Sequence, residues 1–468
     1  MTDAELDRIA ANGFAWVWLL GVWQTGPAGR VVSRTQPVWQ HEYREILSDF
    51  TPDDVCGSPF AVSDYVVNCE LGGPPALESL RARLAARGLK LMLDFVPNHT
   101  ALDHPWARTH PEFYIAGTAA DLAREPQSYC RVETASGPRI LAHGRDPYVP
   151  AWPDTLQVNH RDPGLRGAML DQLGAIAEQC DGVRCDMAML ILPDVIDRTW
   201  GERTRPIDNR PRVDDPFWPV AIDHVRRRRR DFVFMAEAYW DLEWALQQQG
   251  FDYTYDKRLY DRLRAQDAGA VRQHILADTE YQRRCVRFLE NHDEPRAAAV
   301  FPAAVHEAAA VLTLLLPGLG FVHDGQPSGR RVRTSNHLRR RAAEPVDAEL
   351  ASFYERLFAC VRRRDARAGV WRLVDRHPAW DGNPTWDRFI AFEWESPRGR
   401  LLVAVNYGPT QGQCYLRLPW AARDRRRIVF SDLMAPVVRY ERDGRDIAGR
   451  GLYLDMPAWG YHVFEVVA

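Results

Sequence analysis

The sequence has no excess of positive charge and no long apolar run. Its 468 residues carry 60 Lys+Arg against 63 Asp+Glu, a formal net charge of −3. This balance argues against a general nucleic-acid binder, in which a strong basic excess is expected. No apolar run reaches the roughly 20 residues that a transmembrane helix needs, so we also expect no membrane partner.

Lysine is nearly absent, and cysteine forms no recognisable pattern. Lys90 and Lys257 are the only lysines, so almost all positive charge is arginine. The eight cysteines are scattered without a Cys-x-x-Cys pair, which favours reduced thiols over a disulfide framework or a zinc site. The acidic, amphipathic opening does not resemble a secretory signal, so we expect a cytoplasmic protein.

Apolar residues are plentiful and occur in a repeating order. Hydrophobic residues make up 46% of the chain, enough for a large core. Short apolar runs recur and several are followed by helix-like stretches, as at residues 77–87, 165–179 and 303–316. The runs are 14–20, 89–96, 182–187, 232–236, 251–255, 286–289 and 319–322. Strands that alternate with helices predict parallel βαβ units.

Two stretches depart from this alternation. Residues 101–155 are rich in Pro, Gly and aromatic residues without helical period, and from about residue 370 short strands and turns predominate. We therefore predict an α/β fold, a (β/α)8 barrel with an inserted domain and a C-terminal antiparallel β-sandwich. The expected boundaries are 1–100 and 156–368 for the barrel, 101–155 for the insertion and 369–468 for the sandwich.

Polar residues follow four of the apolar runs. Because barrel enzymes build their sites at the carboxyl ends of the strands, these residues are expected to share one mouth. At the end of one run or after it stand Asp94, Asn98 and His99, and at the end of the next stand Arg184 and Asp186; Glu237 follows the third, and His292 and Asp293 follow a later one.

Each of these residues has a structural explanation when it is taken alone. An Asp after a strand is often a helix N-cap, and Arg184 and Asp186 could form an ion pair on one face of a strand. His99 or His292 could be a hydrogen-bonded structural histidine. Four such segments together favour a functional site.

A metal site is a further hypothesis for the same residues. Asp94, His99, His292 and Asp293 offer oxygen and imidazole ligands that one ion can share. Their spacing lacks a compact ligand motif, and a metal would leave other carboxylates unexplained.

Several carboxylates without an obvious cofactor suit glycoside cleavage. A retaining enzyme needs an ionised nucleophile and a protonated acid about 5 to 5.5 Å apart. We expect Arg184 to hold Asp186 ionised, and a more apolar setting near Tyr239 and Trp240 to raise the pKa of Glu237. A third carboxylate could stabilise the charge that develops at the sugar carbon.

These four segments resemble the signature regions of the α-amylase family, the family 13 glycoside hydrolases. The resemblance implies that Asp186 is the nucleophile, Glu237 the general acid/base and Asp293 the transition-state stabiliser. Arg184 would orient the nucleophile. His99 and His292 would bind hydroxyls of the reacting glucose. Asp94 would support the site from behind the residues that contact the sugar.

Further segments carry the same resemblance. Residues 58–65, 154–159 and 316–326 are similar to other conserved segments of the family, and Phe60 stands where a stacking Tyr is usual. Residues 104–114 and 234–238 also resemble bacterial maltosyltransferases of this family.

The sequence departs from the family pattern at three places. Met187-Ala-Met189-Leu190 replaces a Lys-His pair that serves the acceptor side. Ala61 replaces an Asp used by many exo-acting α-glucosidases. Asn98 matches a family calcium position, but a single oxygen donor is far from the six to eight that the ion takes, so a structural calcium has weak support and no cofactor is expected to be required.

The sequence thus predicts a retaining glycosidase or transglycosylase that acts on α-glucosidic bonds, with an α-1,4-glucan or oligosaccharide as substrate. The alternative is a catalytically inactive relative retained as a binding or scaffold protein. Both hydrolysis and transfer are compatible with the sequence, and it predicts no oligomeric state. The run at 14–20 corresponds to the family's second strand, so we also expect the first barrel strand to lie upstream of Met1.

Overall fold

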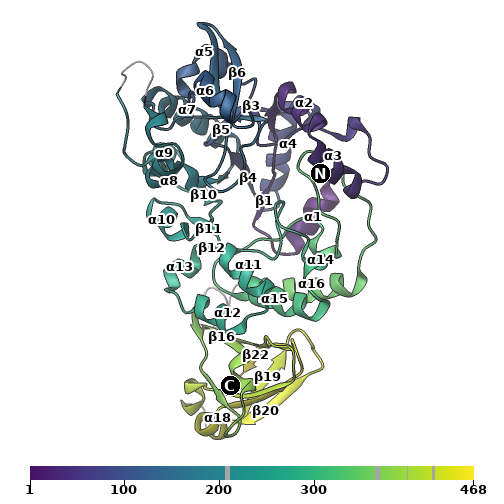
Figure 1. Ribbon diagram of the computed structural model, residues 1–468. Coiled ribbons are helices and arrows are strands. Elements are labelled where there is room, and N and C mark those ends of the chain that lie inside the picture. The colour runs from purple at the N-terminus through teal and green to yellow at the C-terminus, as the bar shows by residue number, and fades with distance from the viewer. Residues whose placement is uncertain (206–210, 364–368, 398, 424–426, 468) are drawn as a thin grey trace. The chain divides into compact units, whose positions relative to one another are not determined.

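The computed structural model describes residues 1–205, 211–363, 369–397, 399–423 and 427–467. The chain divides into two compact units (Figure 1). The first comprises residues 1–255 with 334–342, and the second comprises residues 256–333 with 343–468. Each unit is described by itself below.

The first unit is built on five parallel strands in the order β1, β4, β9, β10, β11. Their bounds are Trp16–Trp18, Lys90–Phe95, Gly182–Cys185, Val233–Ala236 and Tyr253–Tyr255. All four residues of β9 and five of the six in β4 are buried, as expected for strands covered on both faces. The five apolar runs predicted as strands in this part of the chain are confirmed.

Helices connect these strands. α7 begins at Pro163, whose fixed φ suits the first helical turn, and the Asp162 carboxylate accepts a hydrogen bond from the amide of Leu165 at 2.9 Å. The helices of this unit are α1 (Asp3–Ala11), α2 (Pro27–Thr35), α3 (Pro37–Ile46), α4 (Gly73–Ala85), α5 (Pro105–Thr109), α6 (Ala119–Arg124), α7 (Pro163–Gln179), α8 (Pro193–Thr199), α9 (Phe217–Arg226) and α10 (Glu243–Gln248).

The stretch between β4 and α7 is an excursion with its own small elements. It holds α5, α6, the hairpin of β6 (Tyr129–Thr134) and β7 (Gly137–Ala142), and the antiparallel pair of β5 (His99–Ala101) and β8 (Thr155–Gln157). Helical period was not visible in the sequence because α5 and α6 have only five and six residues. A further pair, β2 (Trp23–Thr25) and β3 (Val62–Val67), lies between β1 and α4 in the sequence.

The second unit begins with helices around a parallel pair, β12 (Cys285–Arg287) and β13 (Leu319–Gly320). Both strands were predicted. The helices are α11 (Lys257–Arg264), α12 (Ala268–Ile275), α13 (Thr279–Arg283), α14 (Ala297–Val300), α15 (Ala303–Leu315) and α16 (Ala348–Val361).

The same unit ends in two antiparallel sheets, which confirms the predicted β-rich C-terminal part. One has the order β14, β16, β17, β22, β19, β20 and the other the order β15, β18, β21. Residues of both sheets share one apolar core. The bounds are β14 Val370–Leu373, β15 Arg376–Pro378, β16 Phe389–Ser396, β17 Gly399–Asn406, β18 Gly412–Leu416, β19 Arg427–Asp432, β20 Arg439–Asp443, α18 Gly444–Arg450, β21 Leu452–Met456 and β22 Tyr461–Val467.

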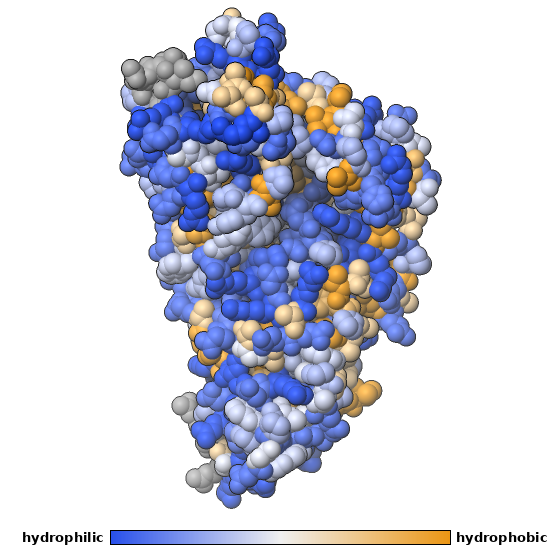
Figure 2. Space-filling view, viewed as in Figure 1, coloured by the Kyte–Doolittle hydropathy of each residue, from blue (hydrophilic) through white to orange (hydrophobic). Residues whose placement is uncertain are grey.

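Hydrophilic residues cover most of the face visible in Figure 2, in keeping with the burial of apolar side chains in these cores. Among the helices of the described residues, none combines the length and the apolar character that crossing a membrane requires.

Gly318 offers a test of the packing in the second unit. Its φ is +108°, and a Cβ at this position would lie 2.3 Å from the carbonyl oxygen of Cys285. Gly382, in the same unit, also has a positive φ (+82°), but a Cβ there meets nothing within 4 Å.

We therefore expect Gly318→Ala to destabilise the protein by roughly 3 kcal/mol or more, and Gly382→Ala by about 1 kcal/mol. Thermal melting of the two variants beside the wild type measures the difference. Equal melting temperatures would contradict the close approach at Gly318.

Candidate active site

Main-chain hydrogen bonds bring the ends of β4, β9 and β10 to one edge of the sheet. In the strand register Arg184 pairs with Asp94 on one side and with Met235 on the other. The ladder continues past the strands, because Asp186 donates its amide to the carbonyl of Phe95 at 2.9 Å. The amide of Glu237 likewise donates to the carbonyl of Cys185 at 3.1 Å. These hydrogen bonds therefore fix the position of the main chain at Asp186 and at Glu237.

The Arg184 side chain is fully buried and contacts three carboxylates. Its Nη1 donates to Asp186 Oδ1 at 2.6 Å, and its Nη2 lies 2.7 Å from Glu237 Oε1. Asp94 Oδ1 lies 3.6 Å from Nη1. Three aromatic rings surround the same guanidinium, those of Trp18, Phe60 and Tyr255 at 5.2, 5.3 and 5.9 Å. The expected pairing of Arg184 with Asp186 is thus present, within a larger cluster.

Glu237 does not have the more apolar setting that the sequence suggested. Besides Arg184, its carboxylate accepts a hydrogen bond from the amide of Met187 at 2.6 Å and one from the hydroxyl of Tyr239 at 3.1 Å. The expectation was wrong because the guanidinium is planar and reaches both carboxylates, and because the chain after Asp186 turns back over Glu237. Met187 makes that turn with a φ of +42°.

Asp94 supports the cluster from the end of β4. Its two carboxylate oxygens accept hydrogen bonds from Trp18 Nε1 at 3.2 Å and from the amide of Gly21 at 2.9 Å. Burial raises the pKa of Asp94 to about 6, against the opposing effect of Arg184. Burial therefore favours the protonated form of Asp94, although Arg184 lies close to it.

His99 lies at the start of β5, on the excursion that follows β4. It is buried, and burial lowers the pKa of the ring, which favours the neutral imidazole. The ring of Trp152 packs against it, with the centroids 5.2 Å apart. A neutral imidazole both donates and accepts hydrogen bonds, which suits the sugar hydroxyl predicted for it.

His292 and Asp293 lie in the second unit, in the loop after β12. Asn291 Oδ1 accepts a hydrogen bond from the amide of Asp293 at 2.9 Å, and His292 Nε2 lies 3.1 Å from Asp293 Oδ2. At the base of the loop, the buried Glu290 carboxylate accepts a hydrogen bond from Arg296 Nη1 at 2.6 Å. The Asp293 carboxylate is 43% exposed. Its expected role, and that of His292, stay predictions.

Sequence reasoning missed several residues of the cluster. Trp18 and Tyr255 lie in apolar runs, where an aromatic residue is normally part of the core. Met187 acts through its main chain, which no side-chain pattern reveals. Tyr239 was expected near Glu237 only as part of an apolar setting, and the hydrogen bond from its hydroxyl was missed.

Asn98, the residue that matches a family calcium position, is already engaged. Its side-chain oxygen accepts a hydrogen bond from Gln157 Nε2 at 3.0 Å, and its carbonyl accepts another from the same amide at 2.9 Å. Among the described residues, no group of three or more His, Cys, Asp or Glu side chains could hold a metal ion. Calcium takes six to eight oxygen ligands, so the residues around Asn98 do not fit this ion.

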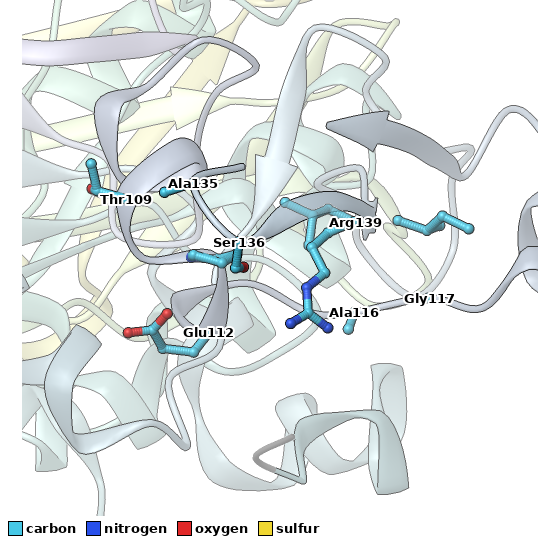
Figure 3. A pocket seen from close by; sticks show the side chains of 10 residues that line it. Thr109, Glu112, Ala116, Gly117, Ala135, Ser136 and Arg139 are labelled. Carbon is cyan, nitrogen blue, oxygen red and sulfur yellow. The ribbon is translucent and has the colours of Figure 1, made fainter. Parts of the chain in front are cut away.

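A separate pocket of about 610 Å³ lies between α5 and the β6–β7 hairpin. The side chains of Glu112, Ser136 and Arg139 lie around it (Figure 3). None of the predicted site residues lines this pocket, so we do not assign the predicted chemistry to it.

Comparison with solved structures shows the fold. Over its whole length the chain is similar to a maltogenic α-amylase, AmyB, from Thermotoga neapolitana, with a TM-score of 0.68, 17% identity and 93% of that chain covered. It also resembles an α-amylase from Geobacillus thermoleovorans complexed with acarbose, with a TM-score of 0.66, 16% identity and coverage of 100% of this chain and 91% of that one. The predicted barrel fold class is thereby confirmed.

Two curated relatives are an α-amylase and an α-glucosidase by name. The chain is 26% identical over 379 residues to the α-amylase MalA of Haloarcula japonica, an alignment that covers 77% of this chain and 49% of the relative. It is 25% identical over 330 residues to an α-glucosidase of Culex pipiens, with 61% and 54% covered. The chain therefore spans about half the length of these relatives.

A family model settles the classification that the signature segments suggested. The model of the alpha-amylase catalytic domain matches residues 52–364, about two thirds of the chain. The matched range contains Asp94, Arg184, Asp186, Glu237 and Asp293. The chain belongs to the α-amylase family.

Proposed function

We propose that this chain is a retaining enzyme that cleaves or transfers α-glucosidic bonds, with an α-1,4-linked glucan or maltooligosaccharide as donor. The observation that carries the proposal is the Arg184 guanidinium, which contacts Asp186 through one nitrogen and Glu237 through the other. The planar guanidinium thus holds the two carboxylates close to each other, as a double-displacement mechanism requires.

The two carboxylates differ in what else they contact. Asp186 pairs with Arg184 at 2.6 Å, a contact that would orient its carboxylate as the nucleophile. Glu237 also contacts the hydroxyl of Tyr239 and the amide of Met187. In the proposed first step Asp186 attacks the anomeric carbon, the bond to the leaving oxygen breaks, and Glu237 gives that oxygen a proton.

In the second step the glycosyl–Asp186 ester is broken. A water or sugar hydroxyl attacks the anomeric carbon, the bond to Asp186 breaks, and the proton of the attacking hydroxyl passes to Glu237. His99 and His292 would bind hydroxyls of the reacting sugar, and Phe60 would pack against its ring. Asp293 would stabilise the positive charge that develops on the sugar in both steps.

The two carboxylates can be tested by isosteric replacement. Asp186→Asn and Glu237→Gln keep the shape of each side chain but remove the nucleophile and the proton donor, so kcat should fall by roughly three orders of magnitude or more. Asp194→Asn, at an exposed carboxylate of α8, is the matched control and should keep wild-type turnover. Unchanged circular dichroism would show that the variants are folded.

Trapping separates the enzyme from an inactive binding protein. Incubation with a 2-deoxy-2-fluoroglycosyl fluoride followed by peptide mass spectrometry should label Asp186. The inactive alternative predicts no label and no turnover on any maltooligosaccharide.

The charge balance of the cluster predicts a pH effect on stability. Because the folded-state pKa of Asp94 is about 6, above the ordinary value of 3.8, the folded protein binds a proton that the unfolded chain releases between these pH values. The contribution of Asp94 to stability therefore decreases as pH rises from about 4 to 6. Asp94→Asn should remove this part of the dependence, so the melting-temperature difference between variant and wild type should change over that range. A constant difference would contradict the raised pKa.

Calcium dependence is the fourth test. Since Asn98 is engaged by Gln157, we expect dialysis against EDTA to leave both turnover and melting temperature unchanged. A loss of either that added calcium restores would contradict this expectation, and would also favour the metal-dependent hypothesis raised from the sequence.

A further inference from the structure

The predicted catalytic residues differ in how far they lie from the strands that precede them. Asp186 and Glu237 directly follow β9 and β10, and main-chain hydrogen bonds of the sheet reach both. Asp293 lies further out, because residues 288–292 separate it from the end of β12. Its position therefore depends on the shape of the loop that connects β12 to α14, residues 288–296.

A turn within the loop fixes the main chain around Asp293. Asn291 is buried, and its Oδ1 accepts hydrogen bonds from the amides of Asp293 and Glu294, each at 2.9 Å. A side-chain oxygen that caps the amides two and three residues further on holds a turn in one local conformation. Where this turn sits depends in addition on the contacts at the two ends of the loop.

One buried carboxylate joins the two ends of the loop. The Glu290 side chain is fully buried, and its Oε1 accepts a hydrogen bond from Arg296 Nη1 at 2.6 Å. Its Oε2 accepts another from the amide of Ala297, the first residue of α14, also at 2.6 Å. The two oxygens of one side chain therefore close the segment that carries Asp293.

Arg296 connects this closed segment to the chain that follows β13. It is buried, and it donates hydrogen bonds to the carbonyl oxygens of Asp324 at 2.9 Å and Val332 at 3.4 Å. His323 Nδ1 lies 3.0 Å from Arg296 Nη1 and 3.2 Å from Glu290 Oε1. Because several of these partners are main-chain atoms, the ion pair acts on the course of two segments of the backbone.

Stability alone does not account for an ion pair that is buried so completely. The desolvation of two charges offsets much of their attraction, and apolar side chains of similar volume often stabilise a protein as well or better. What a guanidinium and a carboxylate do provide is several hydrogen bonds in fixed directions. For a loop that carries a predicted stabiliser of the transition state, direction matters, because a displacement of about 1 Å can lower a rate roughly 100-fold.

We propose that Glu290 and Arg296 are positioning residues, which hold the loop in the shape that presents Asp293 to the sugar. This inference rests on the proposed function, in which Asp293 stabilises the positive charge on the sugar. Both side chains are too deeply buried to contact a substrate, so they act through Asp293. Because that charge develops only on the way to the transition state, loss of the pair lowers kcat more than it weakens substrate binding.

The experiment removes the pair without leaving one buried charge alone. Glu290→Gln/Arg296→Met replaces both charges with neutral side chains of similar size, a change that proteins with buried ion pairs often tolerate. With α-maltosyl fluoride as donor, kcat should fall about 10- to 100-fold while KM stays within about threefold of the wild-type value.

A double-mutant cycle tests whether the pair acts through Asp293. In Asp293→Asn the stabilising charge is already absent, so adding Glu290→Gln/Arg296→Met should change kcat by less than about threefold. A pair with a merely structural role would instead lower kcat by the same factor in both backgrounds.

Glu393→Gln is the matched control for the loss of a buried pair. Glu393 is a buried carboxylate of β16 in the same unit, and it accepts hydrogen bonds from Arg400 and Trp420, both at 2.8 Å. Its replacement should lower the melting temperature and leave kcat unchanged. A fall in kcat as large as that of the loop variant would show that kcat only follows stability, and would overturn the proposal.

The other outcomes separate this inference from the proposed function. A kcat within threefold of wild type in Glu290→Gln/Arg296→Met, failure of that variant to fold, or equal losses in both backgrounds would overturn the positioning role and leave the proposed function intact. A wild-type protein that neither turns over the donor nor is labelled at Asp186 would overturn the proposed function, and this inference with it.

Discussion

The buried guanidinium of Arg184 is the interaction on which the rest of the site depends. It is a single cation among three carboxylates, enclosed by aromatic rings and removed from water. Removing it would leave three buried carboxylates without their common partner, a cost that exceeds that of most substitutions. The position of Arg184 follows in turn from the strand register, which places it between Asp94 and Met235. The register of three short strands thus sets the charge arrangement of the site.

Much of this arrangement could be predicted because strands that are buried on both faces consist mainly of apolar residues. β4, β9 and β10 are mostly apolar, and polar residues near the end of each strand, or directly after it, interrupt the pattern. Asp94, Asp186 and Glu237 were found in this way. The C-terminal antiparallel strands, β17 and β22 among them, were predicted from the short strands and turns that follow about residue 370.

The rest depended on backbone directions that residue types do not encode. The residue types around Met187 do not predict that its amide donates to Glu237, and those around Trp240 do not predict its left-handed conformation. The expected apolar surroundings of Glu237 failed because the guanidinium of Arg184 and the amide of Met187, both distant in sequence, reach its carboxylate. Helices as short as α5 were invisible because periodicity needs more turns than they have.

The hydrogen bond from Met187 to Glu237 has a consequence for how this sequence can vary. Because the donor is a main-chain amide, the bond places no demand on the side chain at position 187, and only proline would abolish it. The chain can therefore exchange the residue that follows its predicted nucleophile, as the replacement of the usual Lys-His pair illustrates, while the two carboxylates keep their link. The residues after Asp186 can thus vary while the main chain keeps the link between the predicted nucleophile and the predicted acid.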